Sequence, residues 1–308
     1  MVSVVCAGIV TADVVFRVER LPERAIKYAA AESALTSGGC ALNAAVAIAR
    51  LGGEAHLAGT IGEDVLGDLI RAEMAAEGVL TDLLARSSSL ATSRSAVLVR
   101  PDGERAIVNH RDPRLFEAEL ALSEPFPHGA ALADTRWPLG AERLLRAARA
   151  SGRPAVLDAE APVALAEGAV HAATHVAFSE QGLSDWTGTT DPSAGLAQAA
   201  RRLGSWVCVT RGAASVLVHD AAGPREIPAF EVPAVDTLGA GDVWHGALAL
   251  FLAEGFVPDE AVRRANAVAA LKIAAFGGRE AVPSRALLER FLQERTVAAA
   301  PAVGTPVP

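Results

Sequence analysis

Apolar residues along the chain follow two different periods, one typical of buried strands and one typical of helices. In the first half, short apolar runs alternate with longer segments in which apolar residues recur every three or four positions. Glycines close the helical segments, at the left-handed position that follows a helix end. The pattern predicts strands at 2–9, 14–18 and 54–60, and helices at 40–51 and 64–77.

The second half alternates more regularly between the two periods. Strands that alternate with helices form a mainly parallel sheet covered by helices on both faces. We therefore expect an α/β fold around one central sheet. The predicted elements are strands at 130–135, 154–158, 174–178 and 205–210, and helices at 140–151, 192–203, 240–254 and 259–276.

Three strand-like segments do not fit this alternation: 14–18, 24–31 and a hairpin at 93–110, with Asp102-Gly103 in its turn. We expect them to form a small separate sheet that acts as a lid. Its segments, at about 14–35 and 93–110, are inserted into one domain that we expect to span 1–295. The Ala- and Pro-rich end, 296–308, is predicted to be disordered.

Composition limits the possible partners. Apolar residues make up 51% of the chain and aromatic residues 5%, so the core is expected to be aliphatic. The net charge of −8 argues against a surface for nucleic acid or anionic membrane. The N-terminus lacks a basic signal region, and no apolar run approaches a membrane span. Cys6, Cys40 and Cys208 have no CxxC spacing, so we expect reduced thiols in a cytoplasmic protein.

The chemistry centres on DTLGAGDVWHGA, residues 236–247. Gly239, Ala240 and Gly241 form a loop at a predicted helix start, where unpaired N–H groups and the helix dipole favour an anion. Asp242 follows, as suits a base that takes a proton from a hydroxyl attacking a phosphoryl group. The positive helix end is expected to keep this acid ionised and weakly basic. GxGD alone is equally compatible with a dipole-favoured acid beside closely packed glycines.

Two segments resemble the signatures of one enzyme family. DTLGAGD resembles the C-terminal signature of the ribokinase/PfkB carbohydrate kinases, and SGGCALNAAVAIARLGGEAHLAGTIGEDVLGDLI (37–70) resembles their N-terminal signature. The resemblance covers about residues 3–292. It implies a ribokinase-like fold with a discontinuous lid, and transfer of the γ-phosphoryl group of ATP, with Mg²⁺, to a primary hydroxyl of a monosaccharide. It also implies that Asp242 is the catalytic base and that 239–241 form the anion hole.

The resemblance assigns further residues by motif position. A substrate group comprises Asp13, Gly38, Gly39 and Asn43. An ATP-binding group comprises Thr210, Gly212, Gly239, Gly241 and Asn266. Asp236 and Thr237 match positions near a monovalent-cation site, such as one for K⁺, although hydrogen bonding within a turn explains both residues equally well. His245 is interpreted as a packing residue.

The chain departs from the family at its metal element. The family usually has Asn-x-x-Glu there, whereas the corresponding stretch, 178–188, has Ser179 in place of Asn and Gly182 in place of the acid. We expect Glu180 to take over contact with Mg²⁺ through water.

The sugar specificity rests on three polar residues, Lys27, Asn109 and Arg136. Each has an ordinary surface explanation, but two cations and an amide together suit an anionic substituent. Their surroundings resemble the sulfofructose-phosphorylating kinases of the family, which implies 6-deoxy-6-sulfofructose as substrate and its 1-phosphate as product. The alternatives are a neutral ketohexose, 2-keto-3-deoxygluconate, a nucleoside, or a catalytically weak sugar or nucleotide sensor. An apolar outer lid face would favour a homodimer.

Overall fold

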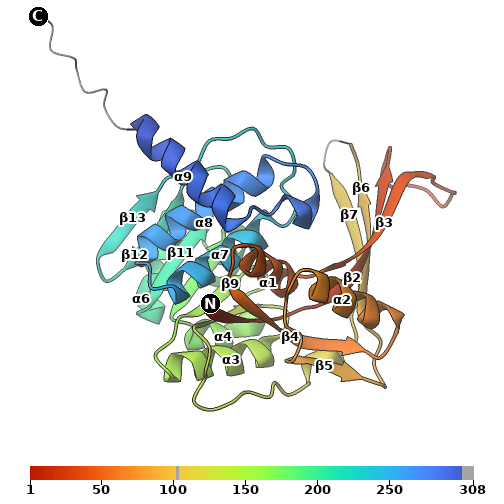
Figure 1. The fold of residues 1–308 in the computed structure, drawn as a ribbon, viewed down its shortest axis with the longest axis horizontal. Helices are drawn as coiled ribbons and strands as arrows, with labels where there is room; N and C mark the ends of the chain where they lie inside the picture. The colour runs from red at the N-terminus through yellow and green to blue at the C-terminus, as the bar shows by residue number, and fades with distance from the viewer. Residues whose placement is uncertain (102–103, 300–308) are drawn as a thin grey trace, which may run out of the picture.

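A mostly parallel sheet forms the centre of the protein (Figure 1). The computed structural model describes residues 1–101 and 104–299. The strands pair in parallel from one edge as far as residues 206–210, and an antiparallel hairpin completes the other edge. In sheet order they are β13 (Gly223–Ile227), β12 (Val216–Asp220), β11 (Trp206–Thr210), β10 (His175–Ser179), β9 (Ala155–Ala159), β8 (Ala130–Asp134), β1 (Ser3–Ala7), β4 (Glu54–Gly62) and β5 (Leu84–Ser87).

Helices cover both faces of this sheet, and each layer has its own apolar core. The predicted α/β architecture is therefore confirmed. None of the described helices is long and apolar enough to cross a bilayer. One layer contains α1 (Cys40–Arg50), α2 (Val65–Ala76), α7 (Ala240–Ala253), α8 (Pro258–Ile273) and α9 (Arg285–Ala299). The other contains α3 (Pro138–Ala150), α4 (Glu167–Ala172), α5 (Glu180–Thr187) and α6 (Pro192–Leu203).

The close crossing of α1 and α7 prepares the site. A Cβ on Gly246 of α7 would lie 2.5 Å from the carbonyl oxygen of Ala44 in α1, so only glycine fits between the two backbones. Helix α7 is apolar on nearly all sides, as expected for a helix inside the protein. Because the two helices pack so closely, residues near their N-termini face each other.

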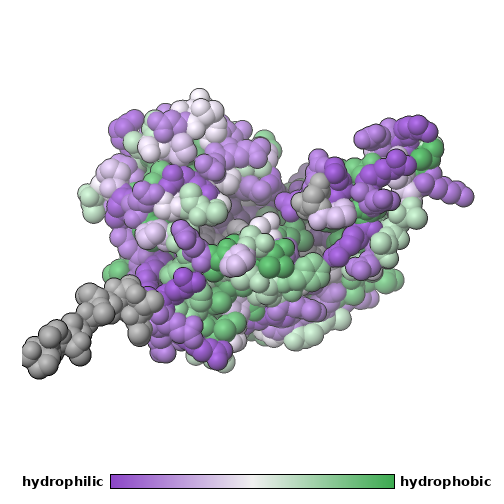
Figure 2. All heavy atoms as spheres, turned by 90° about the horizontal axis from the view of Figure 1, so that it is seen from above, coloured by the Kyte–Doolittle hydropathy of each residue, from purple (hydrophilic) through white to green (hydrophobic). Residues whose placement is uncertain are grey.

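A second, smaller sheet stands beside the main body. Its order is β3 (Ala30–Gly38), β2 (Thr11–Val18), β6 (Ser93–Val99) and β7 (Arg105–His110). Strands β2 and β6 pair in parallel, and the outer pairs are antiparallel. Figure 2 shows this sheet as an arm, with a hollow between it and the body. We call this sheet the lid.

The lid contains the main error of the sequence prediction. A strand was predicted at 24–31, whereas β3 runs over Ala30–Gly38. Its first six residues are exposed, so the strand has no alternation of buried and exposed positions to reveal it. The hairpin at 93–110 is present as β6 and β7. The predicted turn at Asp102-Gly103 lies outside the described residues.

Other boundaries also differ from the prediction. Helices α4 and α5 and the β12–β13 hairpin were not predicted, and they occupy segments with short or irregular apolar patterns. Helix α9 was not predicted either, because the last predicted helix was 259–276, and it extends to Ala299, beyond the domain boundary predicted at 295. Residues 300–308 of the predicted tail are not among those described.

Candidate active site

The Gly38-Gly39 pair connects the lid to α1 through two different constraints. Gly39 has φ = +111° at the start of α1, and a Cβ there would lie 2.2 Å from the carbonyl oxygen of Ile9. A Cβ on Gly38 would lie 2.1 Å from the Asp13 carboxylate. The first glycine therefore makes room for an acid of the lid, and the second provides a turn that other residues enter only with strain.

Asp242 lies in the first turn of α7, next to the predicted anion loop. Gly239 precedes the helix with φ = +72°, and a Cβ on Gly241 would meet nothing within 4 Å. Asn43 of α1 donates a hydrogen bond from Nδ2 to Oδ2 of Asp242 at 2.7 Å. The structure thus brings together an open helix N-terminus, an acid and the amide that orients this acid.

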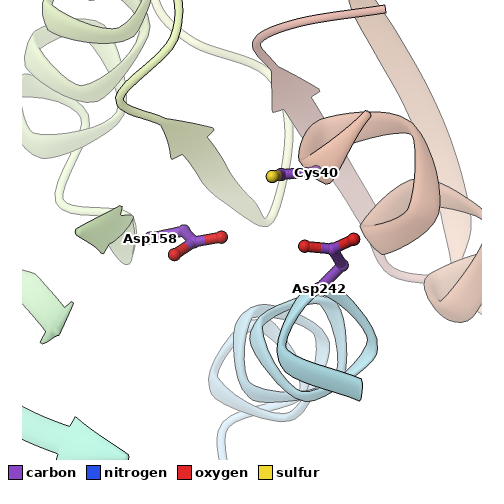
Figure 3. A group of neighbouring side chains, drawn as sticks. All are labelled: Cys40, Asp158 and Asp242. Carbon is purple, nitrogen blue, oxygen red and sulfur yellow. The ribbon is translucent and has the colours of Figure 1, made fainter. Parts of the chain in front are cut away.

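The surroundings of Asp242 overturn one expectation. Cys40, Asp158 and Asp242 extend toward one another from α1, β9 and α7, with their ligand atoms within 4.8 Å of one another (Figure 3). Burial raises the pKa of Asp242, although the hydrogen bond from Asn43 acts in the opposite direction. The helix start was predicted to keep this acid a weak base. The raised pKa instead makes Asp242 a stronger base than an ordinary aspartate, with desolvation as the main cause.

Asp158 behaves in the same way. Burial, and next the neighbouring Asp242, raise its pKa well above the usual range. The three side chains are the only cluster with metal-ligand spacing among residues 1–101 and 104–299. A thiol is a soft ligand and Mg²⁺ prefers oxygen, so the cluster does not have the donor set of a magnesium site.

His245 was interpreted as a residue that packs or supports the site and not as a base, and its Nδ1 lies 3.4 Å from Oδ2 of Asp158. Its side chain is buried, and Nδ1 lies 2.8 Å from the carbonyl oxygen of Gly241. A carbonyl only accepts hydrogen bonds, so Nδ1 carries the proton. Burial lowers the pKa of His245 to about 4, which keeps the ring neutral.

A cavity of about 460 Å³ lies beside the anion loop. This volume lies within the usual range for sites of small molecules. The predicted ATP residues Thr210, Gly212, Gly241 and Asn266 line it, and so do two aromatic residues that the sequence analysis missed, Phe230 and Trp244.

Asn266 has a structural task in this cavity. Its Oδ1 accepts a hydrogen bond from Trp244 Nε1 at 2.7 Å, and its Nδ2 donates to the carbonyl oxygen of Pro228 at 3.0 Å. The amide therefore holds the indole and the 228–230 segment in place, in addition to lining the pocket.

The lid presents a row of polar side chains toward the same face. Asp13 of β2 pairs with Thr36 of β3 and with Ser95 of β6, and Ser95 pairs with Asn109 of β7. Directly opposed residues of a sheet point to the same face, so Asn109 lies on the face that carries Asp13. Lys27 is exposed in the connection between β2 and β3 and has no polar partner within the described part of the chain.

Arg136 follows β8 and is already engaged. It donates from one guanidinium nitrogen to Oε2 of Glu160 at 2.7 Å and from another to the carbonyl oxygen of Ala161 at 2.7 Å. Its backbone N–H donates to Oδ1 of the buried Asp134 at 2.8 Å, while Oδ2 of Asp134 accepts from Ile9 N at 3.0 Å. These bonds join the ends of β8, β9 and β1.

Arg111 is a cation that the sequence analysis missed. It directly follows β7, two residues after Asn109, and is half-buried. Within residues 1–101 and 104–299, no atom forms a hydrogen bond with its buried Nε. Burial, and next the nearby Arg136, lower the pKa of Arg111, while Asp13 acts in the opposite direction. The sequence signal that could have identified Arg111 is its position two residues after Asn109, which was already a predicted sugar-binding residue at the end of the hairpin.

The structure explains the departure in the metal element. Gly182 is buried in α5, and a Cβ there would lie 2.0 Å from the carbonyl oxygen of Ala159. The acid of the usual family pattern has no room at this position. Ser179 Oγ accepts a hydrogen bond from Gly182 N at 2.9 Å and so caps α5. Glu180 remains exposed at the start of that helix, where it follows β10.

Comparisons with known proteins agree with this architecture. The profile of the pfkB family carbohydrate kinases matches residues 1–285. The ATP-dependent ribose-1-phosphate kinase of Halopiger xanaduensis is 30% identical, over 96% of this chain and 99% of its own. The ribokinase of Bacillus subtilis is 27% identical, over 95% of this chain and 100% of its own.

Solved structures give the same result for the fold. A provisionally named ribokinase from Agrobacterium tumefaciens is 35% identical, with a TM-score of 0.90 over 96% of this chain and 99% of its own. Arabidopsis thaliana ribokinase, complexed with ribose and ATP, is 24% identical, with a TM-score of 0.80 over 95% and 99%. The predicted ribokinase-like fold is confirmed, and the chain belongs to the pfkB family of carbohydrate kinases.

Proposed function

We propose that the protein transfers the γ-phosphoryl group of ATP to a primary hydroxyl of a monosaccharide that carries an anionic substituent. The candidate substrate is 6-deoxy-6-sulfofructose, with its 1-phosphate as product. The observation that carries the proposal is the half-buried Arg111 near Arg136, on the side of the site that also holds Asp13. A cation without a hydrogen-bond partner at its buried Nε is costly, and an anionic ligand would offset that cost.

The site geometry supports in-line transfer. A sugar hydroxyl beside Asp242 would lose its proton to this carboxylate as its oxygen attacks the γ-phosphorus, while the bond from that phosphorus to ADP breaks. Asn43 keeps the carboxylate aligned through its 2.7 Å hydrogen bond. The N-terminus of α7 would stabilise the charge on the transferring group through unpaired N–H donors.

Mg²⁺ is part of the proposal as the partner of ATP, where it would neutralise charge on the phosphates. Glu180 is the residue of this chain that we assign to it, through water, because it is exposed at the end of β10. No other acid is available within its own helical turn, since position 182 accepts only glycine.

The substrate assignment gives the polar residues of the site two tasks. Asp13 would bind sugar hydroxyls, and Asn109 lies in the same row of side chains. Arg136 and Arg111 would bind the anionic group, and Lys27 would approach it from its exposed connection when the lid closes. An Arg fork can hold a sulfonate through two hydrogen bonds.

A sugar phosphate is the second candidate substrate. The relative from Halopiger xanaduensis is named for ribose 1-phosphate, which is also an anionic sugar, and it is 30% identical over nearly the whole chain. The same pair of arginines would suit a phosphate. The two candidates differ in ring structure and in the distance between the anion and the reacting hydroxyl.

A substrate screen tests the proposal. ADP release is measured with sulfofructose, ribose 1-phosphate, 2-keto-3-deoxygluconate, fructose, ribose and a nucleoside, with wild type and with Arg111→Met. We expect an anionic sugar to have the highest kcat/KM and Arg111→Met to lower it about 10- to 100-fold, the usual effect of losing one ionic hydrogen-bond partner. A wild-type preference for a neutral sugar would contradict the proposal.

We also propose a homodimer formed through the lids. The face of the lid opposite to Asp13 carries a row of apolar side chains, Leu35, Val14, Ala96 and Val108. Val108 is 71% exposed and Leu35 is 48% exposed, which is unusual for side chains of this size. Light scattering after size-exclusion chromatography checks it: Val108→Asp should yield monomers where wild type yields dimers.

A further inference from the structure

Lys272 is a buried cation at the base of the anion loop. It lies in the last turn of α8 and is 1% exposed. Its Nζ donates a hydrogen bond to the backbone carbonyl oxygen of Asp236 at 2.9 Å and lies 3.4 Å from Oδ2 of the same residue. A buried ammonium is costly unless it is paired, so this lysine has a defined electrostatic task.

The oxygens around this cation belong to the residue that the family resemblance assigns to a monovalent cation. All three oxygens of Asp236 already have donors. Oδ1 accepts from Leu238 N at 2.9 Å, Oδ2 accepts from Gly278 N at 3.0 Å, and the carbonyl oxygen accepts from Lys272 Nζ. Thr237, the other assigned residue, is exposed. The residues present therefore do not fit a K⁺ ion at Asp236.

The choice of side chain supports the same conclusion. The chain contains 28 basic residues, of which two are lysines, Lys27 and Lys272, and the others arginines. A guanidinium is planar and wide, whereas an ammonium is a compact point charge of a kind that resembles a bound alkali ion. Nearly all basic residues of the chain are arginines, but the cation that contacts Asp236, at the start of the 236–241 loop, is a lysine.

We propose that the Lys272 ammonium takes the place of a monovalent cation and holds the 236–241 loop in its phosphoryl-binding shape, so that the enzyme needs no K⁺. The loop begins at the carbonyl that Lys272 contacts and ends at Gly241, directly before the base. Because the ammonium is covalently attached to the chain through the lysine side chain, its position is fixed and no entropy cost arises from capturing an ion from solution.

The same contact network reaches the lid. Gly278 donates to Asp236, and its neighbour Arg279 donates to Ser37 Oγ at 2.7 Å and to Glu73 Oε2 at 2.6 Å. Ser37 belongs to the end of β3, next to Gly38. The built-in cation is therefore joined, through three residues, to the hinge between the lid and α1.

Turnover in different salts tests the proposal. The inference rests on the proposed kinase activity. The kcat is therefore measured with the best sugar of the screen in KCl, NaCl and tetramethylammonium chloride at equal ionic strength. Wild type should show equal kcat, within twofold, in all three. Lys272→Met should lose about 10- to 100-fold in kcat in tetramethylammonium chloride, and K⁺ should restore part of it. Stimulation of wild type by K⁺ of fivefold or more overturns the proposal.

Thermal melting provides a readout that needs no substrate. Wild type should melt at the same temperature in K⁺ and in tetramethylammonium, whereas Lys272→Met should melt lower and should be stabilised by K⁺ alone. Lys272→Arg retains the positive charge, so any stability that it loses results from the larger, planar shape of the guanidinium.

Arg225→Met is the matched control, because it removes a paired cation near the opposite end of α8, where Arg225 binds Asp220 and Asp259. It should lower the melting temperature without any specific response to K⁺. A folded Lys272→Met protein that retains wild-type kcat in tetramethylammonium, or loses activity that K⁺ does not restore, also overturns the proposal.

Discussion

Substitution of Gly241 separates folding from catalysis at the anion loop. A Cβ built on Gly241 meets nothing within 4 Å, and its φ is not positive, so alanine fits the empty site without strain. The residue also lines the 460 Å³ cavity that we expect to bind ATP. Gly241→Ala should therefore keep the fold and place a methyl group in the space that a γ-phosphoryl group would occupy. Gly241→Val should extend the same obstruction.

The magnitudes follow from general values. Alanine in place of glycine in a helix gains at most about 1 kcal/mol, which would raise Tm by about 2 °C in a chain of this size. Displacing a reacting group by about 1 Å costs on the order of 100-fold in rate. We thus expect an unchanged or slightly raised Tm and a kcat/KM lowered at least 100-fold, measured by calorimetry and by coupled ADP release.

Gly255→Ala provides the opposite result at the other end of α7. Gly255 has φ = +89° with open space around it, so alanine meets no atoms but must adopt a left-handed backbone. The cost is about 1–2 kcal/mol, with Tm lowered by several degrees and kcat unchanged. If Gly241→Ala turns over at the wild-type rate, or if both variants lose activity in proportion to stability, this loop does not bind the transferring group.

Three further predictions concern the proposed base, the proposed anion site and the cavity lined by Trp244. Asp242→Asn should lower kcat at least 1,000-fold while ATP and sugar still bind by calorimetry, and because burial raises the pKa of Asp242, wild-type kcat/KM should fall on the acid side at a higher pH than an ordinary aspartate would give. Arg136→Met should lower kcat/KM for the anionic sugar about 10- to 100-fold and for fructose less than threefold; equal losses would contradict the anion role. Trp244→Leu should raise the KM for ATP with little change in the KM for the sugar, since Trp244 lines the cavity that we expect to bind ATP.

The sequence was most informative where one local constraint determines a residue. Buried parallel strands such as β1 and β8 are continuous apolar runs, and they were found at nearly their observed bounds. Gly38 and Gly39 were assigned through the family resemblance, and the structure adds the reason that a Cβ at either position would meet an atom at 2.1 or 2.2 Å. The 239–241 loop was recognised because small residues before a helix let an anion approach its N–H groups. An exposed strand such as β3 has no such constraint and was placed several residues too early.

The missed features depend on contacts between distant segments. The raised pKa of Asp242 results from burial within a cluster formed by α1, β9 and α7, segments whose proximity the sequence does not reveal. Arg111 became a candidate anion-binding residue only because it lies near Arg136 and Asp13, which are 25 and 98 residues away in the sequence. In the sequence, Gly182 stands where the family has an acid, and only the structure shows that a Cβ there would lie 2.0 Å from the carbonyl oxygen of Ala159.

The charges of Asp242 and Lys272 act together on the loop between them. In the proposed reaction Asp242 is a base whose pKa is raised by desolvation, and the Lys272 ammonium at Asp236 supports the loop that would bind the phosphoryl group. A buried acid alone would repel the incoming phosphates, and Lys272 also lies within the electrostatic reach of Asp242. The positive charge therefore offsets part of that repulsion without needing solvent access, which a mobile ion would require. A kinase with this arrangement can close its lid over a dry site while the charge balance at the anion loop stays the same.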